Sequence, residues 1–225
     1  MEYQQIKLSI NFKMKFLTKE LIFPDVNAAD KSGILAFGGD LSPERLLLAY
    51  RSGIFPWFNI DEPIIWWAPH SRMVMFPDEL TISKSMRNVI NKNIFTITFN
   101  QDFKQVISNC QQTPRKGQVG TWLTNDMIAA YCKLHEMGFA KSVEVWQNDE
   151  LIGGLYGIDL GHVFCGESMF SKVSNASKFA FINLVQHLQE NNYQLLDCQV
   201  HNDHLESLGC REISREAFMG VLNRS

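Results

Sequence analysis

Three polar side chains that can do acid–base and hydrogen-bonding chemistry lie in stretches that are otherwise mostly apolar. Glu167 interrupts residues 164–170, and Asp197 and Gln199 interrupt residues 194–200. A carboxylate in an apolar strand is costly unless it is paired or hydrogen-bonded. The pattern predicts either an apolar pocket with a few orienting polar groups or a structural polar network, and spacing alone leaves both open.

The alternation of side chains along a strand says how these groups should be aimed. Side chains two residues apart point to the same face of a strand. We therefore expect Asp197 and Gln199 to share one face of their strand, and Glu167 and Met169 to share one face of theirs. On this geometry the Asp197 carboxylate could hydrogen-bond towards the Gln199 side chain and polarise its amide.

A helix separates the two strands. Residues 175–190 have a helical period, with Ala176, Phe179, Ala180, Val185 and Leu188 near one stripe and Phe181 and Leu184 beside it. Asn175 or Ser174 can cap the start of this helix. The stretch 164–200 therefore predicts a strand, a helix and a buried strand in succession.

The remaining chain predicts a mixture of helices and strands. Strands are expected at 95–99, 142–146, 150–158 and 162–170, ahead of the one at 194–200, and helices at 42–52, 81–90, 102–110, 125–137 and 202–208. Residues 211–222 close the fold. The middle three strands are joined by turn residues and predict an antiparallel meander. We expect an α+β fold with a mostly antiparallel central sheet flanked by helices.

Length and proline spacing bear on domain organisation. The chain has 225 residues, of which 45% are hydrophobic, enough to bury a full core. Pro56, Pro63 and Pro69 make residues 55–70 a plausible boundary. We therefore expect a small N-terminal α+β domain at 1–68 and a larger domain at 69–225.

Targeting and metal signals are weak. No run of about 18 apolar residues predicts a membrane span, and residues 1–20 lack the apolar core of a signal peptide. The five cysteines show no CxxC spacing, which favours reduced thiols in a cytoplasmic protein over a zinc site. Because no heptad repeat or long apolar edge is evident, we expect a monomer.

Charge is unevenly distributed. The net charge is −3, but residues 71–120 carry seven basic against three acidic side chains, which makes +4 there. A basic region on an acidic protein can bind a phosphate backbone locally, although an ordinary solvated surface has the same composition. Lys84 and Arg87 on a predicted helix, with Arg115 and Lys116 in a polar loop, are the candidates for such contacts.

Several motifs together resemble one family. They are GGDLS (38–42), GIFPWF (53–58), WWAP (66–69), GTW (120–122), CGESMFS (165–171), NASK (175–178) and DCQV (197–200). In this order they resemble the signatures of the bacterial leucyl/phenylalanyl-tRNA–protein transferases, over about residues 23 to 218. The resemblance implies that the larger domain has an acetyltransferase-like (GNAT) fold.

The resemblance also implies an activity and its substrates. An aminoacyl-tRNA carrying Leu or Phe, less readily Met, would donate its amino acid to a protein whose N-terminal residue is Arg or Lys, and so mark that protein for N-degron-dependent degradation. The reaction needs no ATP, metal or other cofactor, because the ester is already activated. Asp197 and Gln199 would orient the attacking amine, and Glu167 would hold the donor's α-amine or adenosine. We expect Asp197→Ala to lower transfer strongly and to leave the fold intact.

Other residues are assigned to substrate binding on the same grounds. Trp57 and Trp122 would contact the substrate, Trp57 at the aminoacyl-adenosine site. The donor side chain would enter an apolar pocket, for which the matching positions are Leu155, Met169, Phe181, Leu184, Leu188 and Leu196. Where we expect Met at 155 and Phe at 184 and 188 in the family, this chain has Leu, which affects the balance among donors.

Two other functions fit parts of the sequence. An acetyl-CoA-dependent N-acetyltransferase would need a glycine-rich pyrophosphate loop at the start of a helix, but residues 171–178 contain no glycine. A non-catalytic tRNA-binding module would have a more basic chain, and it would not need Glu167, Asp197 and Gln199 together.

Overall fold

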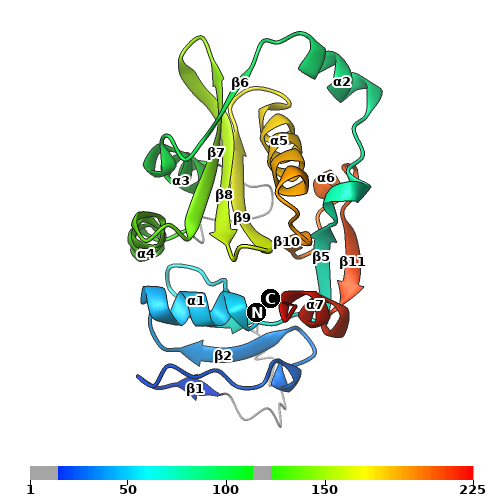
Figure 1. Ribbon diagram of the computed structural model, residues 1–225. Helices are drawn as coiled ribbons and strands as arrows, with labels where there is room; N and C mark the ends of the chain where they lie inside the picture. Colours follow the sequence, from blue (N-terminus) through cyan, green and yellow to red (C-terminus); the bar gives the residue numbers. More distant parts are fainter. Residues whose placement is uncertain (1–14, 114–122, 225) are drawn as a thin grey trace, which may run out of the picture.

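The protein is built around two β-sheets that lie end to end (Figure 1). The structure is a computed structural model that describes residues 15–113 and 123–224. The smaller sheet contains, in spatial order, β1 (Phe16–Leu17), β2 (Ile34–Gly38), β4 (Ile65–Trp67) and β3 (Phe55–Pro56). Helix α1 (Pro43–Arg51) connects β2 to β3, and the Ser42 side chain caps its start by accepting from the Arg45 backbone N–H.

The larger sheet carries the strands singled out in the sequence. Its order is β11 (Arg211–Ser214), β5 (Ser71–Met75), β10 (Leu195–Gln199), β9 (Val163–Ser171), β8 (Glu150–Asp159), β7 (Ala140–Gln147) and β6 (Thr96–Phe99). All neighbours are antiparallel except β9 and β10. The prediction of an α+β fold with a mostly antiparallel sheet and a β7–β8–β9 meander is confirmed.

Helices cover both faces of this sheet (Figure 1). Helix α5 (Ala176–Glu190) is the crossover between the parallel strands β9 and β10, which cannot be joined by a short turn. Helices α3 (Phe103–Gln112) and α4 (Asn125–Glu136) pack on the opposite face. The remaining helical elements are α2 (Lys84–Asn91), α6 (Asp203–Glu206), α7 (Arg215–Leu222) and short 3-10 turns at Val26–Ala28 and Pro77–Glu79.

The start of α5 differs from expectation. Asn175 occupies the cap position, but it has a left-handed backbone with φ of 71° and its side chain makes no capping hydrogen bond. Ser171 Oγ instead accepts from the Ser177 backbone N–H at 3.3 Å. The cap therefore comes from the end of β9, which ties the strand to the helix that follows it.

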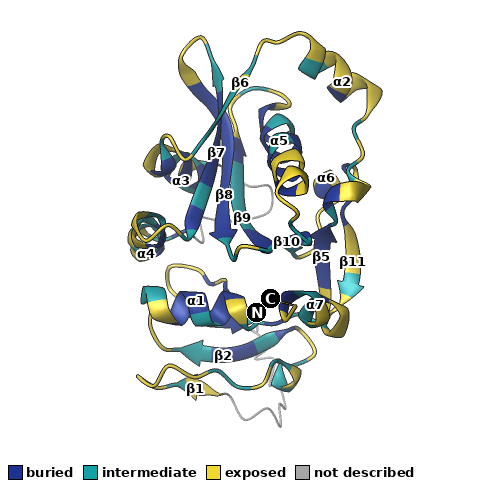
Figure 2. Cartoon of the chain, viewed as in Figure 1, coloured by how far each residue is buried: buried dark blue, intermediate teal, exposed yellow. Residues whose placement is uncertain are grey.

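The strands of the larger sheet are mostly buried (Figure 2). Two clusters of buried side chains lie on the two sides of this sheet. The first cluster includes Leu35 and Trp66 of the small sheet together with Val106 and Tyr131 from α3 and α4. The second cluster lies between the sheet and α5. Residues before and after position 68 thus share the first cluster.

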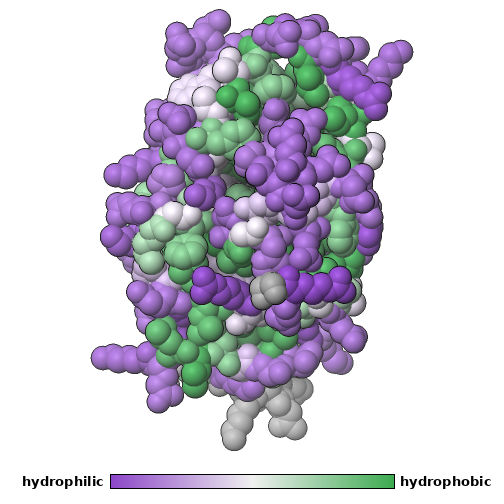
Figure 3. Space-filling view, in the orientation of Figure 1, coloured by the Kyte–Doolittle hydropathy of each residue, from purple (hydrophilic) through white to green (hydrophobic). Residues whose placement is uncertain are grey.

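The face in Figure 3 is largely hydrophilic, with separate hydrophobic patches. Among the described residues, no helix combines the length and apolar character needed to cross a bilayer.

Candidate active site

A pocket opens where β9 and β10 stop pairing. Their ladder joins only residues 195–197 to residues 163–165. The residues that follow on each strand line a pocket of about 350 Å³. The lining residues are Phe55, Pro56, Trp57, Leu155, Tyr156, Gly166, Glu167, Ser168, Met169, Phe181, Leu184, Leu196, Cys198, Gln199, Val200, Asn202 and Leu205. Because β3 contributes Phe55 and Pro56, the pocket lies at the junction of the two sheets.

Most of the predicted apolar positions lie in this pocket. Leu155, Met169, Phe181, Leu184 and Leu196 line it. We call these five residues, with Leu205, the apolar wall.

Leu188 is the exception among the predicted pocket residues. It is 1% exposed, packs in the second core cluster and does not line the pocket. Leu188 lies one helical turn beyond Leu184, and the pocket extends along α5 only as far as Leu184. Leu205 of α6 was not predicted, because α6 is one turn long and has no helical period to read.

Trp57 lies at the pocket, as predicted. Its side chain is 41% exposed, and its ring centroid is 5.6 Å from that of Trp67. The Trp67 indole N–H donates to the Trp57 carbonyl oxygen at 2.7 Å, which fixes the backbone that carries the exposed ring. Trp122, Arg115 and Lys116 lie outside the described residues.

An irregularity in β9 determines the direction of the Glu167 side chain. The β8–β9 ladder pairs Tyr156 with Ser168 and then Gly157 with Gly166, so Glu167 is an extra residue, as in a β-bulge. The expectation that Glu167 and Met169 share a face was wrong. Glu167 contacts Tyr131 of the first core cluster, whereas Met169 packs against the second. The bulge changes the side-chain alternation between the two residues.

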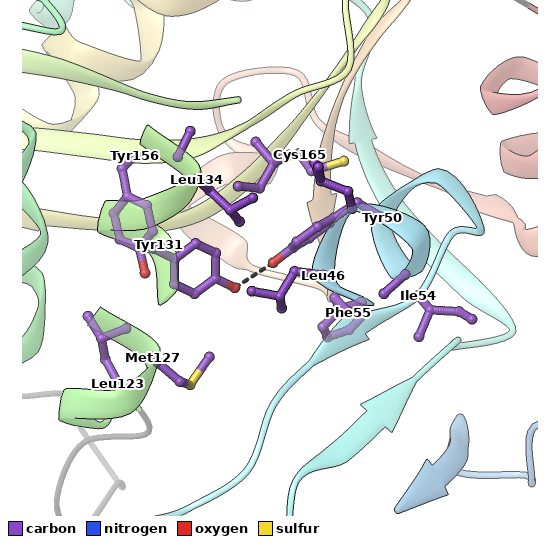
Figure 4. Packing of buried hydrophobic residues seen from close by; sticks show 14 of the residues in the cluster. Leu46, Tyr50, Ile54, Phe55, Leu123, Met127, Tyr131, Leu134, Tyr156 and Cys165 are labelled. Atoms are coloured by element: carbon purple, nitrogen blue, oxygen red, sulfur yellow. Dashed lines mark hydrogen bonds between the residues drawn. The ribbon is translucent and has the colours of Figure 1, made fainter. Parts of the chain in front are cut away.

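Glu167 is the centre of a chain of hydrogen bonds. Its Oε2 accepts from the Tyr131 hydroxyl at 2.8 Å, and the Tyr131 and Tyr50 hydroxyl oxygens are 2.5 Å apart (Figure 4). Its Oε1 accepts from Gln199 Nε2 at 2.7 Å. We call Glu167, Gln199, Tyr131 and Tyr50 the polar wall; Glu167 and Gln199 line the pocket, and the two buried tyrosines support Glu167 from behind. The four residues come from β9, β10, α4 and α1.

The surroundings of Glu167 change its acidity. Burial raises the pKa of Glu167 to about 7, although hydrogen bonds from Tyr131, Tyr50 and Gln199 oppose the rise. The partners that face it donate hydrogen bonds without carrying a charge of their own, so they only partly replace the lost hydration of the carboxylate. Glu167 can therefore exchange a proton near neutral pH, as a general acid or base must.

Asp197 has a different environment. It is 0% exposed and receives Arg72 Nε at 2.8 Å and Nη2 at 2.7 Å, which is a bidentate ion pair. Its Oδ1 also accepts from the Gln199 backbone N–H at 2.8 Å, whereas the Gln199 side-chain amide donates to Glu167. The expectation that Asp197 polarises the Gln199 side chain was wrong, because Arg72 and the Gln199 backbone occupy the carboxylate.

The sequence reasoning missed Arg72, Tyr50 and Tyr131. A signal for Arg72 was present, since an arginine in an apolar strand needs a partner just as a buried carboxylate does. The two tyrosines had no such signal, because each lies on the apolar side of its helix and reads as core.

The remaining predicted contacts lie elsewhere. Lys84 and Arg87 are exposed on α2 and do not line the pocket. Figure 1 shows α2 at the end of the larger sheet that is away from the small sheet. In the described part of the chain, one exposed group could hold a metal ion, namely His201, Asp203 and Glu206, whose ligand atoms lie within 4.8 Å of one another.

The fold and the site together define a class of protein. A mostly apolar pocket of about 350 Å³ lies beside a carboxylate whose pKa is raised to about 7. This combination is typical of an enzyme active site, in which the pocket holds a substrate and the carboxylate can handle a proton.

Comparison with known proteins identifies the family. Residues 74–223 match the family model described as leucyl/phenylalanyl-tRNA protein transferase, and residues 39–70 match the model of its N-terminal domain. The chain is 69% identical to the leucyl/phenylalanyl-tRNA–protein transferase of Flavobacterium johnsoniae, over 93% of this chain and 99% of that protein. It is 64% identical to that of Flavobacterium psychrophilum, over 94% of this chain and 100% of that protein. The chain belongs to the leucyl/phenylalanyl-tRNA–protein transferase family, and the resemblance read from its motifs is confirmed.

Solved structures are only distantly similar to this chain. FemX aligns with a TM-score of 0.48 at 11% identity, covering 76% of this chain and 66% of that one. A Bacillus licheniformis protein described as L-PGS aligns with a TM-score of 0.40 at 16% identity, covering 71% and 51%. The family assignment rests on the sequence relatives.

Proposed function

We propose that this protein transfers Leu or Phe, and less readily Met, from aminoacyl-tRNA to the N-terminal Arg or Lys of a protein, marking that protein for degradation. The observation that carries the proposal is the pocket, in which an apolar wall faces a polar wall with a titratable carboxylate. Family membership supports the reaction class, because the relatives' names describe transfer between a tRNA and a protein.

The two sides of the pocket fit the two parts of the donor. A Leu, Phe or Met side chain would contact the aliphatic and aromatic side chains of the apolar wall, such as Phe181 and Leu184. Trp57, exposed at the same pocket, would stack on the terminal adenine, as aromatic side chains do with unpaired bases. Trp122, Arg115 and Lys116 remain candidates for contacts with the tRNA, as do Lys84 and Arg87.

The chemistry needs positioning and one proton path. The neutral amine of the acceptor attacks the ester carbonyl carbon, a C–N bond forms, and the bond to the ribose oxygen breaks. The amine loses one proton and the ribose oxygen gains one, so no other reactant is consumed. The Gln199 side-chain amide donates to Glu167 through Nε2. Among the described residues, none donates a hydrogen bond to its oxygen, Oε1. Gln199 Oε1 would accept from the amine, and ionised Glu167 would relay the proton.

The pocket favours this reaction over the two alternatives. An N-acetyltransferase would have to bind the pyrophosphate of acetyl-CoA, and residues 171–178 at the start of α5 contain no glycine. A non-catalytic tRNA-binding module would not need a carboxylate that titrates near pH 7 beside an amino-acid-sized pocket. With the reaction we also propose a GNAT-like fold for residues 69–225, a small N-terminal α+β domain at 1–68, a monomer and a cytoplasmic location.

One experiment tests the reaction class. Purified protein is mixed with radiolabelled Leu-tRNA or Phe-tRNA and a peptide that begins with Arg, without ATP or acetyl-CoA. A matched peptide that begins with Ala is the control. We expect label to move to the Arg peptide only. Binding of tRNA without transfer would favour the binding module, and acetylation of the peptide when acetyl-CoA is supplied would favour the acetyltransferase.

A further inference from the structure

Arg72 is buried at the meeting point of three elements. It lies on β5, is 2% exposed, and gives two of its donors to Asp197 on β10. A third donor, Nη1, reaches the carbonyl oxygen of Gly53 at 3.0 Å, just after α1. Its guanidinium carbon lies 4.8 Å from the ring centroid of Phe55 and 4.5 Å from that of Phe218. These contacts hold the guanidinium in one orientation.

The Asp197 carboxylate, held by Arg72, in turn fixes the backbone of Gln199. The Gln199 backbone has φ of 66°, a left-handed conformation that is unusual for any residue except glycine. The β10–β5 register shifts at the same point, between Asp197 and Gln199. Asp197 Oδ1 accepts both from Arg72 and from the Gln199 backbone N–H, so the ion pair stabilises the turn that aims the Gln199 side chain at Glu167.

The opposite end of Arg72 is attached to the small sheet. Gly53 and Phe55 belong to the segment that continues into Trp57 of the pocket. Gly53 also follows Tyr50 by three residues, and Tyr50 bonds to Tyr131, which bonds to Glu167. Hydrogen bonds therefore connect Arg72 to Asp197, Asp197 to Gln199, Gln199 to Glu167, and Glu167 to the two tyrosines. The chain from Tyr50 to Gly53 leads back to Arg72, which donates to the Gly53 carbonyl.

We infer that Arg72 is a positioning residue for the transfer reaction: it holds the Gln199 turn through Asp197, while the Gly53 carbonyl anchors the other side of its guanidinium. This inference rests on the proposed function. Arg72 does not line the pocket, and it acts through Asp197 and Gln199. The shared Asp197 oxygen connects the ion pair directly to the backbone of a residue that lines the pocket.

The test is Arg72→Lys, which keeps the charge and loses the planar fork. We expect kcat for transfer to fall at least tenfold with a smaller change in KM, because a misplaced Gln199 affects the transition state more than donor binding. The same substitution in a Gln199→Ala background should cause less than a twofold further loss. A merely structural arginine would lower activity by the same factor in both backgrounds.

The chain offers a matched control. Arg211 donates to Glu79 at 2.8 and 2.9 Å and lies 4.6 Å from the Phe76 ring centroid, but its side chain is 51% exposed and it does not line the pocket. Arg211→Lys should transfer within twofold of the wild-type protein. Thermal unfolding of each variant establishes that the assay compares folded proteins.

Several outcomes would overturn the inference. Wild-type activity in Arg72→Lys would do so, as would a loss that multiplies with that of Gln199→Ala. If Arg72→Lys does not fold, the double variant Arg72→Gln/Asp197→Asn removes both buried charges together, and it should show the same dependence on Gln199. Absence of transfer by the wild-type protein itself would overturn the proposed function, and this inference with it. The variant results above, obtained with an active wild-type protein, would overturn the inference alone.

Discussion

The two walls of the pocket are built in different ways. The apolar wall is made of aliphatic and aromatic side chains that extend the second core cluster, for example Leu155, Phe181 and Leu184. Such contacts are non-directional, and volume-conserving exchanges among apolar side chains usually cost little. The polar wall depends on directed hydrogen bonds at 2.5–2.8 Å between four elements.

This difference predicts different consequences of change. Removing one member of a buried hydrogen-bonded network leaves its partners unsatisfied, whereas trimming an apolar wall changes the space available to a ligand. We therefore expect substitutions in the polar wall and its supports to affect rate and stability, and substitutions in the apolar wall to affect which donor is used.

The largest effect is expected at Asp197, which supports the polar wall from behind. Asp197→Ala leaves Arg72 buried without its ion-pair partner, which costs about 3–5 kcal/mol. We expect transfer to be abolished and the free energy of unfolding to fall by this amount, measured by denaturant titration. This replaces the expectation, made from the sequence, that the fold of the variant stays intact.

The control for Asp197→Ala is the exposed ion pair between Arg211 and Glu79. Glu79→Ala breaks the pair with Arg211 at the surface, where such pairs contribute about 0–1 kcal/mol. Wild-type stability in Asp197→Ala would mean that Arg72 finds another partner, and would contradict the proposed support.

Next in size is the effect of Glu167→Gln on rate. If ionised Glu167 relays the proton, kcat should fall by about 10²–10⁴-fold. The pKa of Glu167 is about 7, so wild-type activity should decrease as pH falls through 7, and this acid limb should be absent from the residual activity of the variant. A raised KM with unchanged kcat would instead assign Glu167 to donor binding.

Glu167 also makes stability depend on pH. Its pKa in the folded protein, about 7, lies above the ordinary value of 4.5, so the folded state binds more protons than the unfolded state between these values. Stability is therefore fully present below pH 4.5 and declines as pH rises to 7, by up to about 3 kcal/mol. Glu167→Gln should remove this decline and raise the unfolding midpoint at pH 8, measured by thermal unfolding against pH.

The apolar wall offers a matched pair of leucines on one helix. Leu184 lines the pocket, whereas Leu188, one turn further along α5, is buried in the core. Leu184→Ala should change the ratio of kcat/KM for Phe-tRNA and Leu-tRNA by about tenfold in favour of Phe, because a larger pocket loses contacts with the smaller side chain. The assay is transfer from both donors to one peptide.

Leu188→Ala is the control for that change. It should lower the free energy of unfolding by about 2–5 kcal/mol, as for other buried leucines, and leave the donor ratio unchanged. An equal change of donor ratio in both variants would show that the helix as a whole, and not the wall, controls donor choice.

The smallest effect is expected at α2, which lies outside both walls. If Lys84 and Arg87 contact the tRNA backbone, replacing both with Gln should weaken tRNA binding a few-fold and reduce its salt dependence by a slope of about 1–2. Lys31→Gln, in an exposed turn of the small-sheet region, is the control. An unchanged slope would exclude α2 from the tRNA contact.

The sequence by itself determined strands β6 to β10, most of the helices, the family and most of the apolar wall, whereas the strands of the small sheet and β5 were not predicted. Period-two and helical patterns predicted β9, α5 and β10, and Ser42, Asp102 and Asn202 cap helices. These features depend on residues close together in the chain, where alternation, helical period and capping chemistry are directly readable.

The tertiary structure alone decided how the polar groups are connected. Arg72 and Asp197 are 125 residues apart in the chain, and Tyr50 and Tyr131 are 81 apart. No local period reports such pairs, because they exist only once the strands and helices have packed. The bulge at Glu167 and the left-handed turn at Gln199 break the alternation from which their directions were predicted, and for this reason the sequence identified these two residues but did not predict their partners.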